Sequence, residues 1–365
     1  MMKIGNPKVQ GYLDNGKLPC FDNSTINSDL TAWTRFKVLL DESINAGVLS
    51  SSTVSTYALA YTTSYAYSGG VLALNGDIHF VPLYSSIGQK IDINGFVSTY
   101  AVISGYSGGV LAPNGDIHFI PYSATKGQKI NINGFVSTYS AIGGYSGGVL
   151  APNGDIHFIP HSAQIGQKIN INGQPSTYEL KHTVPNAYHG GVLAANGDIH
   201  FIPDYSLKGQ KIDVNGTVST YSLKYIGNEY GGQYNGGVIS PNGDIHFVPA
   251  CASKGRKIDI NGNLSTYSLV YFCDWAYSGG VLASNGDIHF VSYCAGIGQK
   301  IDINGNVSTY TLQCSDLYGY YGGVLASDGN IHFIPYSATK GQKISILSDK
   351  PFSKAICCSP FFNKL

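Results

Sequence analysis

Short apolar runs alternate with polar turns along most of this chain. The unit from Gly108 to Tyr139 contains four such runs: Gly-Val-Leu-Ala, Asp-Ile-His-Phe-Ile, Lys-Ile-Asn-Ile and Val-Ser-Thr-Tyr. Runs of this length, bounded by Gly, Asn and Pro, are typical of β-strands. Asn114-Gly115 separates the first and second runs, and Asn133-Gly134 separates the third and fourth. Since Asn-Gly favours tight hairpins, the unit predicts four antiparallel strands, here called A to D.

The unit occurs seven times, and its register is shifted at the two ends of the chain. Ser-Thr-Tyr first occurs at Ser55, before any double glycine, and no copy follows Gly341. A period of about 40 residues with four strands is that of a β-propeller. We therefore predict an all-β, seven-bladed propeller over residues 51–346, in which the N-terminal strand completes the last blade. The double glycines begin at Gly69, Gly108, Gly147, Gly190, Gly236, Gly279 and Gly322.

Length varies between the copies only in the connections from strand D to the next strand A. In a propeller blade these crossovers emerge on the same face as the B-to-C loops, here called the crossover face. The tight A-to-B and C-to-D turns lie on the opposite face, here called the turn face. Because variable connections on a rigid scaffold commonly carry binding, we expect the crossover face to be the working face.

Composition narrows the classes of function. The chain has 365 residues with 22 basic and 22 acidic side chains, so it lacks the excess of positive charge with which proteins neutralise phosphates. No nucleic acid partner is expected. The N-terminus has no apolar core of a secretory signal, and no run reaches transmembrane length, so we expect neither classical secretion nor membrane insertion.

Seven cysteines, an odd number, show no metal-like spacing. A bridge between Cys251 and Cys294, which share one repeat position, is conceivable, but free buried thiols in a reducing compartment are favoured.

Two segments flank the predicted ring. Residues 1–50 contain apolar side chains at helical spacing between Ser28 and Gly47, which predicts one short helix. Residues 347–365 form an apolar tail that includes Phe352 and Phe361. Neither segment can form a core alone, so both are interpreted as attachment segments.

Several repeated side chains are candidates for chemistry. Each second strand carries a His, which in six of the seven copies lies two residues after an Asp, as in Asp77 and His79, and in the seventh after Asn330. We interpret these histidines as structural, hydrogen-bonded between blades, rather than as metal ligands. No catalytic motif or cofactor motif is present, so we expect no enzyme activity, no metal and no cofactor.

The candidate ligand-binding residues are aromatic side chains with a few polar neighbours. A tyrosine precedes each double glycine; packing between blades is favoured for these residues, and stacking on a sugar or peptide is the alternative. The crossovers add further aromatic and acidic residues. The candidates are Tyr67, Tyr106, Tyr145, Tyr188, Tyr234, Tyr277 and Tyr320 before the glycines, and Tyr225, Tyr230, Tyr271, Asp274 and Trp275 in the crossovers.

The repeat Gly-Gly-Val-Leu-Ala-Pro-Asn-Gly-Asp-Ile-His-Phe-Ile-Pro (Gly108 to Pro121), with Gly-Gln-Lys and Val-Ser-Thr-Tyr, resembles propeller repeats in structural proteins of tailed bacteriophages, in tail or capsid appendages. The resemblance implies a non-enzymatic virion component, made in the host cytoplasm, that displays the propeller for adhesion to a host-surface glycan. Its partners would then be other virion proteins, bound through residues 1–50 and 347–365. The alternative is a free-standing, lectin-like or protein-interaction scaffold in the cytoplasm of a cell.

Overall fold

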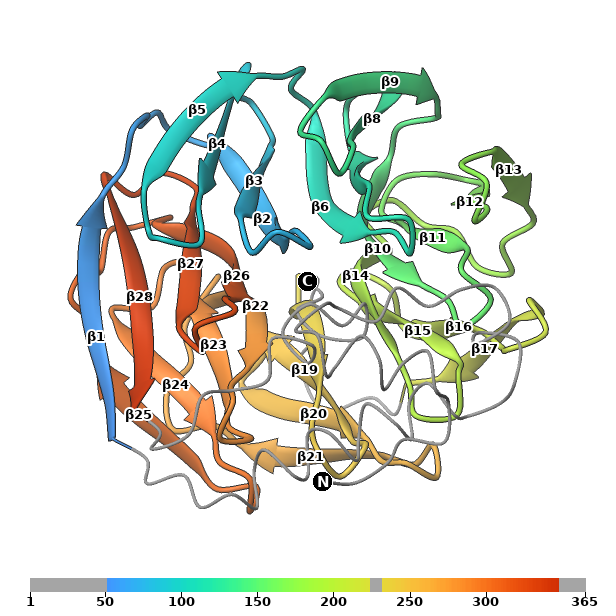
Figure 1. The fold of residues 1–365 in the computed structure, drawn as a ribbon. Coiled ribbons are helices and arrows are strands. Elements are labelled where there is room, and N and C mark those ends of the chain that lie inside the picture. Colours follow the sequence, from blue (N-terminus) through green and yellow to red (C-terminus); the bar gives the residue numbers. More distant parts are fainter. Residues whose placement is uncertain (1–50, 224–231, 348–365) are drawn as a thin grey trace, which may run out of the picture.

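The computed structural model describes residues 51–223 and 232–347, and every regular element in this part of the chain is a β-strand. The strands form seven four-stranded antiparallel sheets, arranged radially around a central axis (Figure 1). The predicted seven-bladed propeller is thereby confirmed. The helix predicted between Ser28 and Gly47 and the apolar tail lie outside the described residues.

Each blade has one strand of each type, and the A strands surround the axis (Figure 1). The A strands are β2 (Tyr67–Leu72), β6 (Tyr106–Leu111), β10 (Tyr145–Leu150), β14 (Tyr188–Leu193), β18 (Tyr234–Ile239), β22 (Tyr277–Leu282) and β26 (Tyr320–Leu325). The B strands are β3 (Ile78–Pro82), β7 (Ile117–Pro121), β11 (Ile156–Pro160), β15 (Ile199–Pro203), β19 (Ile245–Pro249), β23 (Ile288–Ser292) and β27 (Ile331–Pro335). Blades are numbered 1 to 7 in this order.

The C and D strands form the outer part of each blade. The C strands are β4 (Ile87–Ile91), β8 (Lys126–Ile130), β12 (Gly166–Ile169), β16 (Lys208–Ile212), β20 (Lys254–Ile258), β24 (Ile297–Ile301) and β28 (Lys340–Leu347). The D strands are β5 (Val97–Ala101), β9 (Val136–Ser140), β13 (Pro175–Tyr178), β17 (Val218–Ser222), β21 (Leu264–Ser268), β25 (Val307–Thr311) and, in blade 7, β1 (Ser51–Ala58).

The ring closes through the N-terminal strand, as the shifted register predicts. β1 pairs with β28 in antiparallel register from Ser51 opposite Leu347 to Ala58 opposite Lys340. β1 and β28 are each eight residues long, whereas the other C and D strands have four or five. The seam between the two ends of the ring is therefore longer than any other C–D pairing.

The double glycines allow the blades to approach one another closely. The first glycine of blade 1, Gly69, has a φ of 83° and lies in a register shift between Tyr67 and Gly70. A Cβ on Gly70 would lie only 2.7 Å from Cδ1 of Ile334 in the neighbouring blade. A side chain here would overlap side chains of the neighbouring blade, so the glycine permits this close approach of the two A strands.

The repeated histidines are structural, but the prediction that they bridge two blades is wrong. His79 Nδ1 lies 3.0 Å from the Tyr100 hydroxyl, and both residues belong to blade 1. The Tyr100 ring crosses strand C at Gly88, where a Cβ would lie 2.6 Å from its Cε2. Tyrosine, glycine and histidine therefore act together across three strands, because only a residue without a side chain leaves room for the ring.

The aspartates near these histidines have a lysine as their partner. Asp77 Oδ2 accepts a hydrogen bond from Lys90 Nζ at 2.6 Å, and equivalent ion pairs occur in blades 1 to 6. In blade 7, Asn330 takes the place of the aspartate. Among the described residues, no three His, Cys or carboxylate side chains converge in a way that could hold a metal ion.

The Gln of Gly-Gln-Lys makes hydrogen bonds that link neighbouring blades. Gln89 of blade 1 accepts hydrogen bonds at Oε1 from the backbone N–H groups of Ala60 and Tyr61, at 2.9 and 2.8 Å. These two residues begin the crossover that leaves blade 7, and the Gln89 side chain is fully buried. In six blades the glutamine thus holds the start of a crossover against the next blade, whereas blade 5 has Arg256 at this position.

The crossovers and the B-to-C loops lie on the same face, as expected. Leu83 N–H donates to the Ala66 carbonyl at 2.9 Å, and Tyr84 N–H donates to the Tyr65 carbonyl. The four described cysteines, Cys251, Cys273, Cys294 and Cys314, are free, although they are half-buried rather than fully buried. Within the described part of the chain, no helix has the length and apolar character that a membrane span requires.

Candidate functional site

The seven tyrosines before the double glycines belong to the core, and a direct role in ligand binding is wrong for them. All seven are 0–1% exposed. Tyr67 packs edge-on against Phe80, and its hydroxyl donates to the Ile87 carbonyl at 2.9 Å. Burial of the ring and use of its only polar group leave nothing for a ligand. The others are Tyr106, Tyr145, Tyr188, Tyr234, Tyr277 and Tyr320.

The residue that follows each of these tyrosines faces the axis. In four blades it is a serine, and Ser107 Oγ lies 3.0 Å from both Ser68 Oγ and Ser146 Oγ. Hydroxyl contacts between neighbouring blades are this short only where the strands converge on the axis. The seven residues are Ser68, Ser107, Ser146, His189, Asn235, Ser278 and Tyr321.

Tyr321 breaks the symmetry of this ring by reaching across the axis. Its hydroxyl lies 2.6 Å from His189 Nε2, and Asn235 Nδ2 donates to it at 3.1 Å. These residues belong to blades 7, 4 and 5. Blades 4 and 7 are not neighbours in the ring, so the Tyr321 side chain reaches His189 by crossing the axis. The serines at this position in other blades are too short to do so. Ser146 Oγ also contacts His189 Nε2 at 2.8 Å.

A second layer of irregular residues follows the B strands on the crossover face. Tyr336 and Tyr293 contact Tyr321, with ring centroids 5.3 and 5.6 Å away. His161 lies 6.1 Å from the His189 ring and 5.3 Å from the Tyr122 ring. With the residues at the axis they form one group, here called the axial cluster: Tyr122, His161, His189, Asp204, Asn235, Tyr293, Tyr321 and Tyr336.

The histidines and the aspartate of the axial cluster are uncharged between about pH 4 and 7. Asp204 is only 7% exposed, and burial raises its pKa to about 7. Burial lowers the pKa of His161 to about 4 and that of His189, which also faces His161, to about 3. Asp204 Oδ2 and His161 Nε2 are 4.0 Å apart, too far for a hydrogen bond. Because burial disfavours charge on both groups, a protonated carboxyl faces a neutral imidazole until the pH approaches 7.

Three exposed aromatic residues, in the crossovers that lead into the neighbouring blades 6, 7 and 1, have an unusual backbone conformation. Tyr65, Trp275 and Tyr318 have φ values of 61°, 55° and 56°. They are 46%, 38% and 38% exposed and hold equivalent positions, two residues before the buried tyrosine of the next A strand. Left-handed backbone is uncommon for bulky residues. At the same position of blades 4 and 5, Asn186 and Gly232 adopt it without that penalty.

These three residues are here called the aromatic rim, and two of them contact the axial cluster. Tyr65 and Tyr336 have ring centroids 5.0 Å apart, and Tyr318 and Tyr293 have centroids 5.2 Å apart. The backbone of Trp275 is held by its neighbours, since its N–H donates to Cys251 Sγ at 3.4 Å and its carbonyl accepts from Cys294 N–H. Rim and cluster together present aromatic rings and few charges on the crossover face.

The crossover candidates from the sequence have different positions. Trp275 belongs to the aromatic rim, and the neighbouring Asp274 is exposed. Tyr271 is half-buried, and its N–H donates to Gln299 Oε1 at 2.8 Å. Tyr225 and Tyr230 lie outside the described residues.

The axial cluster was missed by sequence reasoning, although a signal was present. The repeat varies at the residue after the buried tyrosine and at the residue that ends strand B or follows it. His189, Tyr321 and Asp204 are departures at these positions. When the repeats are nearly identical, a residue that differs from its equivalents in the other blades is a candidate for a role outside the repeated packing.

Comparison with known proteins supports the fold. No family model matches the chain, and no curated protein matches it in sequence. Solved structures do match. A streptogramin B lyase has a TM-score of 0.69 at 19% identity, covering 81% of this chain and 98% of its own. A catalytically inactive histidine-to-alanine variant of virginiamycin B lyase from Staphylococcus aureus, with quinupristin, has a TM-score of 0.70 at 17% identity, covering 81% and 100%. An auxiliary nutrient binding protein from Bacteroides ovatus has a TM-score of 0.55 at 12% identity, covering 82% and 78%. At these identities the likeness extends to the propeller alone.

Proposed function

We propose that this chain is a non-enzymatic binding protein that holds a neutral carbohydrate on the crossover face. The aromatic rim is the observation that carries the proposal. Asn and Gly occupy the equivalent left-handed position in two other blades, so a purely structural requirement is met without strain. Retaining Tyr65, Trp275 and Tyr318 there costs stability, and such strain is concentrated at functional sites.

The chemistry of the face favours a sugar over a charged ligand. Aromatic rings offer flat apolar surfaces with polar tips, which suit the apolar faces and hydroxyls of a sugar. Within the axial cluster, Asp204 and His161 are both uncharged between about pH 4 and 7. A neutral polyol can therefore exchange its water for phenol and imidazole contacts without leaving an unpaired charge behind.

Glycan binding by the full chain and two variants tests the proposal. Trp275→Ala should weaken binding to an array of bacterial and mucin-type polysaccharides by about tenfold, since one stacking ring is lost. Phe272→Ala is the matched control, because Phe272 is an exposed aromatic of the same crossover, 57% accessible, without left-handed backbone. Absence of any glycan bound, or equal loss in both variants, would sink the proposal.

The setting that we propose is a virion appendage, in which residues 1–50 and 347–365 attach the ring to the particle. The resemblance of the repeats to phage structural proteins supports it. An antibody against the propeller should detect the chain in the particle band of a density gradient from the producing culture. Removal of residues 1–50 leaves β1 intact and should abolish this association while preserving glycan binding. A chain found only in the soluble fraction would point to the free-standing scaffold.

General acid–base catalysis is a second candidate function, favoured by Asp204. A carboxyl with a pKa of about 7 is well placed to exchange protons at neutral pH, and His161 is beside it. Lyases share the fold, so quinupristin is a practical first substrate. Incubation with the chain, followed by mass spectrometry, would favour catalysis if a product forms that Asp204→Asn does not make. An unchanged antibiotic counts against this lyase chemistry.

A further inference from the structure

The turn face carries a groove between blades 4 and 5 that is separate from the axial cluster. Its volume is about 430 Å³, within the range of roughly 300–1,000 Å³ usual for small-molecule sites. The equivalent groove between blades 5 and 6 measures about 150 Å³, below that range. Blade 4 contributes the A-to-B turn and its ion pair to the wider groove, and blade 5 contributes its C-to-D turn.

The greater width coincides with a small residue in the A-to-B turn. Ala195 lines the groove between blades 4 and 5, whereas Pro241 stands at the same repeat position in the narrower groove. Elsewhere, bulkier residues at this position extend toward the next blade. Leu74 Cδ1 lies 2.8 Å from where a Cβ of Gly115 would be, and Pro152 Cγ lies 3.6 Å from that of Gly197. Ala195 has no side-chain atoms beyond Cβ and leaves this space open.

One wall of the groove offers a neutralised ion pair. Lys211 Nζ donates to Asp198 Oδ2 at 2.7 Å, and Asn196 Nδ2 donates to the same oxygen at 3.1 Å. The Lys211 side chain is 33% exposed, and Asp198 is its only hydrogen-bond partner among the described residues, so two of its three ammonium hydrogens are available. His200 and Tyr221, which also line the groove, are bonded to each other at 3.2 Å.

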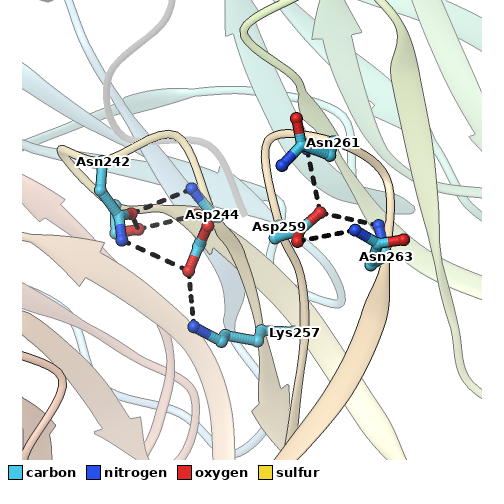
Figure 2. Close-up of polar contacts among 7 residues, drawn as sticks. Asn242, Asp244, Lys257, Asp259, Asn261 and Asn263 are labelled. Atoms are coloured by element: carbon cyan, nitrogen blue, oxygen red, sulfur yellow. Dashed lines mark hydrogen bonds and ion pairs between the residues drawn. The ribbon is translucent and has the colours of Figure 1, made fainter.

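The opposite wall is a turn whose carboxylate is already satisfied. Asp259 accepts hydrogen bonds from Asn261 N–H at 2.9 Å, from Asn263 N–H at 2.7 Å and from Asn263 Nδ2 at 3.0 Å. Figure 2 shows this turn together with Asp244 and Lys257, the ion pair that blade 5 presents to its other neighbour. The Asn263 bonds hold the pKa of Asp259 below its usual range, so the carboxylate stays ionised and paired.

The groove therefore carries one lysine and two carboxylates, and each carboxylate is already hydrogen-bonded within its own wall. Apolar side chains, including Ile245, Ile258 and Leu264, also line it. A phosphate or carboxylate ligand would have to compete with Asp198 for Lys211, and a cation would have to compete with the amides for Asp259. A neutral molecule with several hydroxyls can accept from the remaining ammonium hydrogens and bond the Asn261 amide without breaking either arrangement. We infer that the groove between blades 4 and 5 is a second binding site, for one neutral monosaccharide unit.

This inference rests on the proposed function for its ligand class, but it places a separate site on the opposite face. A chain with sugar sites on both faces could bridge two glycans. The site has three features together: the Asp198–Lys211 ion pair of blade 4, the Asn261 turn of blade 5, and Ala195 in the A-to-B turn.

Ala195→Pro is the sharpest test, since Pro occupies this position in blades 2, 3 and 5. The turn accepts it, because Gly197 N–H bonds the Ala194 carbonyl and Pro is favoured at the second position of such turns. Titration of the full chain with glucose, galactose, mannose and N-acetylglucosamine, followed by saturation-transfer NMR, should show one sugar whose affinity falls at least tenfold in Ala195→Pro. Asn261→Ala, which keeps the backbone N–H bonded to Asp259, should weaken the same sugar.

The aromatic rim variant separates this inference from the proposed function. A sugar signal lost in Ala195→Pro and retained in Trp275→Ala supports the groove, even if the crossover face binds nothing. A signal lost only in Trp275→Ala overturns the groove and leaves the proposed function standing. Equal binding by wild type, Ala195→Pro and Asn261→Ala overturns the groove, as does the absence of binding by every form.

Discussion

At the scale of single residues, the repeat shows which positions are constrained by contact and which are free. Gly88 and its equivalents exist to accommodate a tyrosine ring, since the Tyr100 ring passes directly over the strand and bonds His79 beyond it. The Gly, the His and the Tyr are far apart in the repeat, but they belong to a single three-residue contact. No residue with a side chain can replace the glycine without moving the ring.

Gly88→Ala should lower the stability of the folded chain by about 1–3 kcal/mol, because its Cβ would overlap Tyr100 and displace it from His79. Thermal unfolding followed by circular dichroism measures the effect. Gly296→Ala is the control, since no atom lies within 4 Å of its added Cβ and its φ is not positive. Equal melting temperatures for the two variants would contradict the contact account.

The residue scale also separates core from site among the aromatics. The seven tyrosines before the double glycines lie close in sequence to the exposed aromatic residues of the rim, yet they are only 0–1% exposed. Tyr65, Trp275 and Tyr318 lie two residues before such a buried tyrosine, at a position where the backbone is left-handed. A shift of two residues in a crossover decides whether a ring packs or is presented to solvent.

At the scale of elements, the seam between β1 and β28 carries the closure of the ring. β1 supplies Tyr57, whose hydroxyl lies 3.3 Å from His332 Nδ1, so blade 7 has its complete set of contacts only when the two ends of the ring meet. Without β1, the whole length of β28 would become an exposed edge, which invites pairing with other chains.

A chain that begins at Leu59 should melt at least about 5 °C below a chain that begins at Ser51, because it loses eight paired residues and the Tyr57 contact. It should also associate, which size-exclusion chromatography detects. The chain that begins at Ser51 serves as the control for loss of residues 1–50. If both truncated chains melt together as monomers, β1 does not close the ring in the way described.

At the scale of the whole molecule, sevenfold repetition multiplies small effects. Seven buried histidines all have lowered pKa values, about 3 for His289 and about 4 for the other six, with burial as the main cause. The ordinary value in an unfolded chain is about 6.5. Between pH 6.5 and 4, these histidines therefore bind protons in the unfolded chain but remain neutral in the folded chain.

Stability should fall as the pH is lowered from 6.5 to 4, since the stabilising contribution of a lowered histidine pKa is complete only above the unfolded value. Asp204 acts in the opposite sense between about pH 4 and 7, but this one carboxyl is outweighed by the seven repeated imidazoles together with those of His161 and His189. Melting temperatures measured from pH 7.5 to 4.5 should decline steeply. His118→Gln should make the decline shallower by removing one of the seven sites, and a constant melting temperature over this range would refute the account.

Much of the fold was determined by the sequence alone, because its signals are local and repeated. Asn-Gly pairs specify hairpins through the conformations that two residues prefer, and the shifted position of Ser-Thr-Tyr specifies closure by strand exchange. Seven copies of the same local preference leave little freedom in architecture. The blade count, the closing strand and the two faces could all be derived in this way.

The axial cluster and the groove were decided by tertiary structure. His189 and Tyr321 are 132 residues apart in the chain, and they meet because opposite blades converge on one axis. No local pattern records which side chains face one another across a closed ring. The width of the groove likewise depends on how far Ala195 of one blade lies from the turn of the next. Local sequence dictates each blade, whereas the sites arise between blades, where distance in space is independent of distance along the chain.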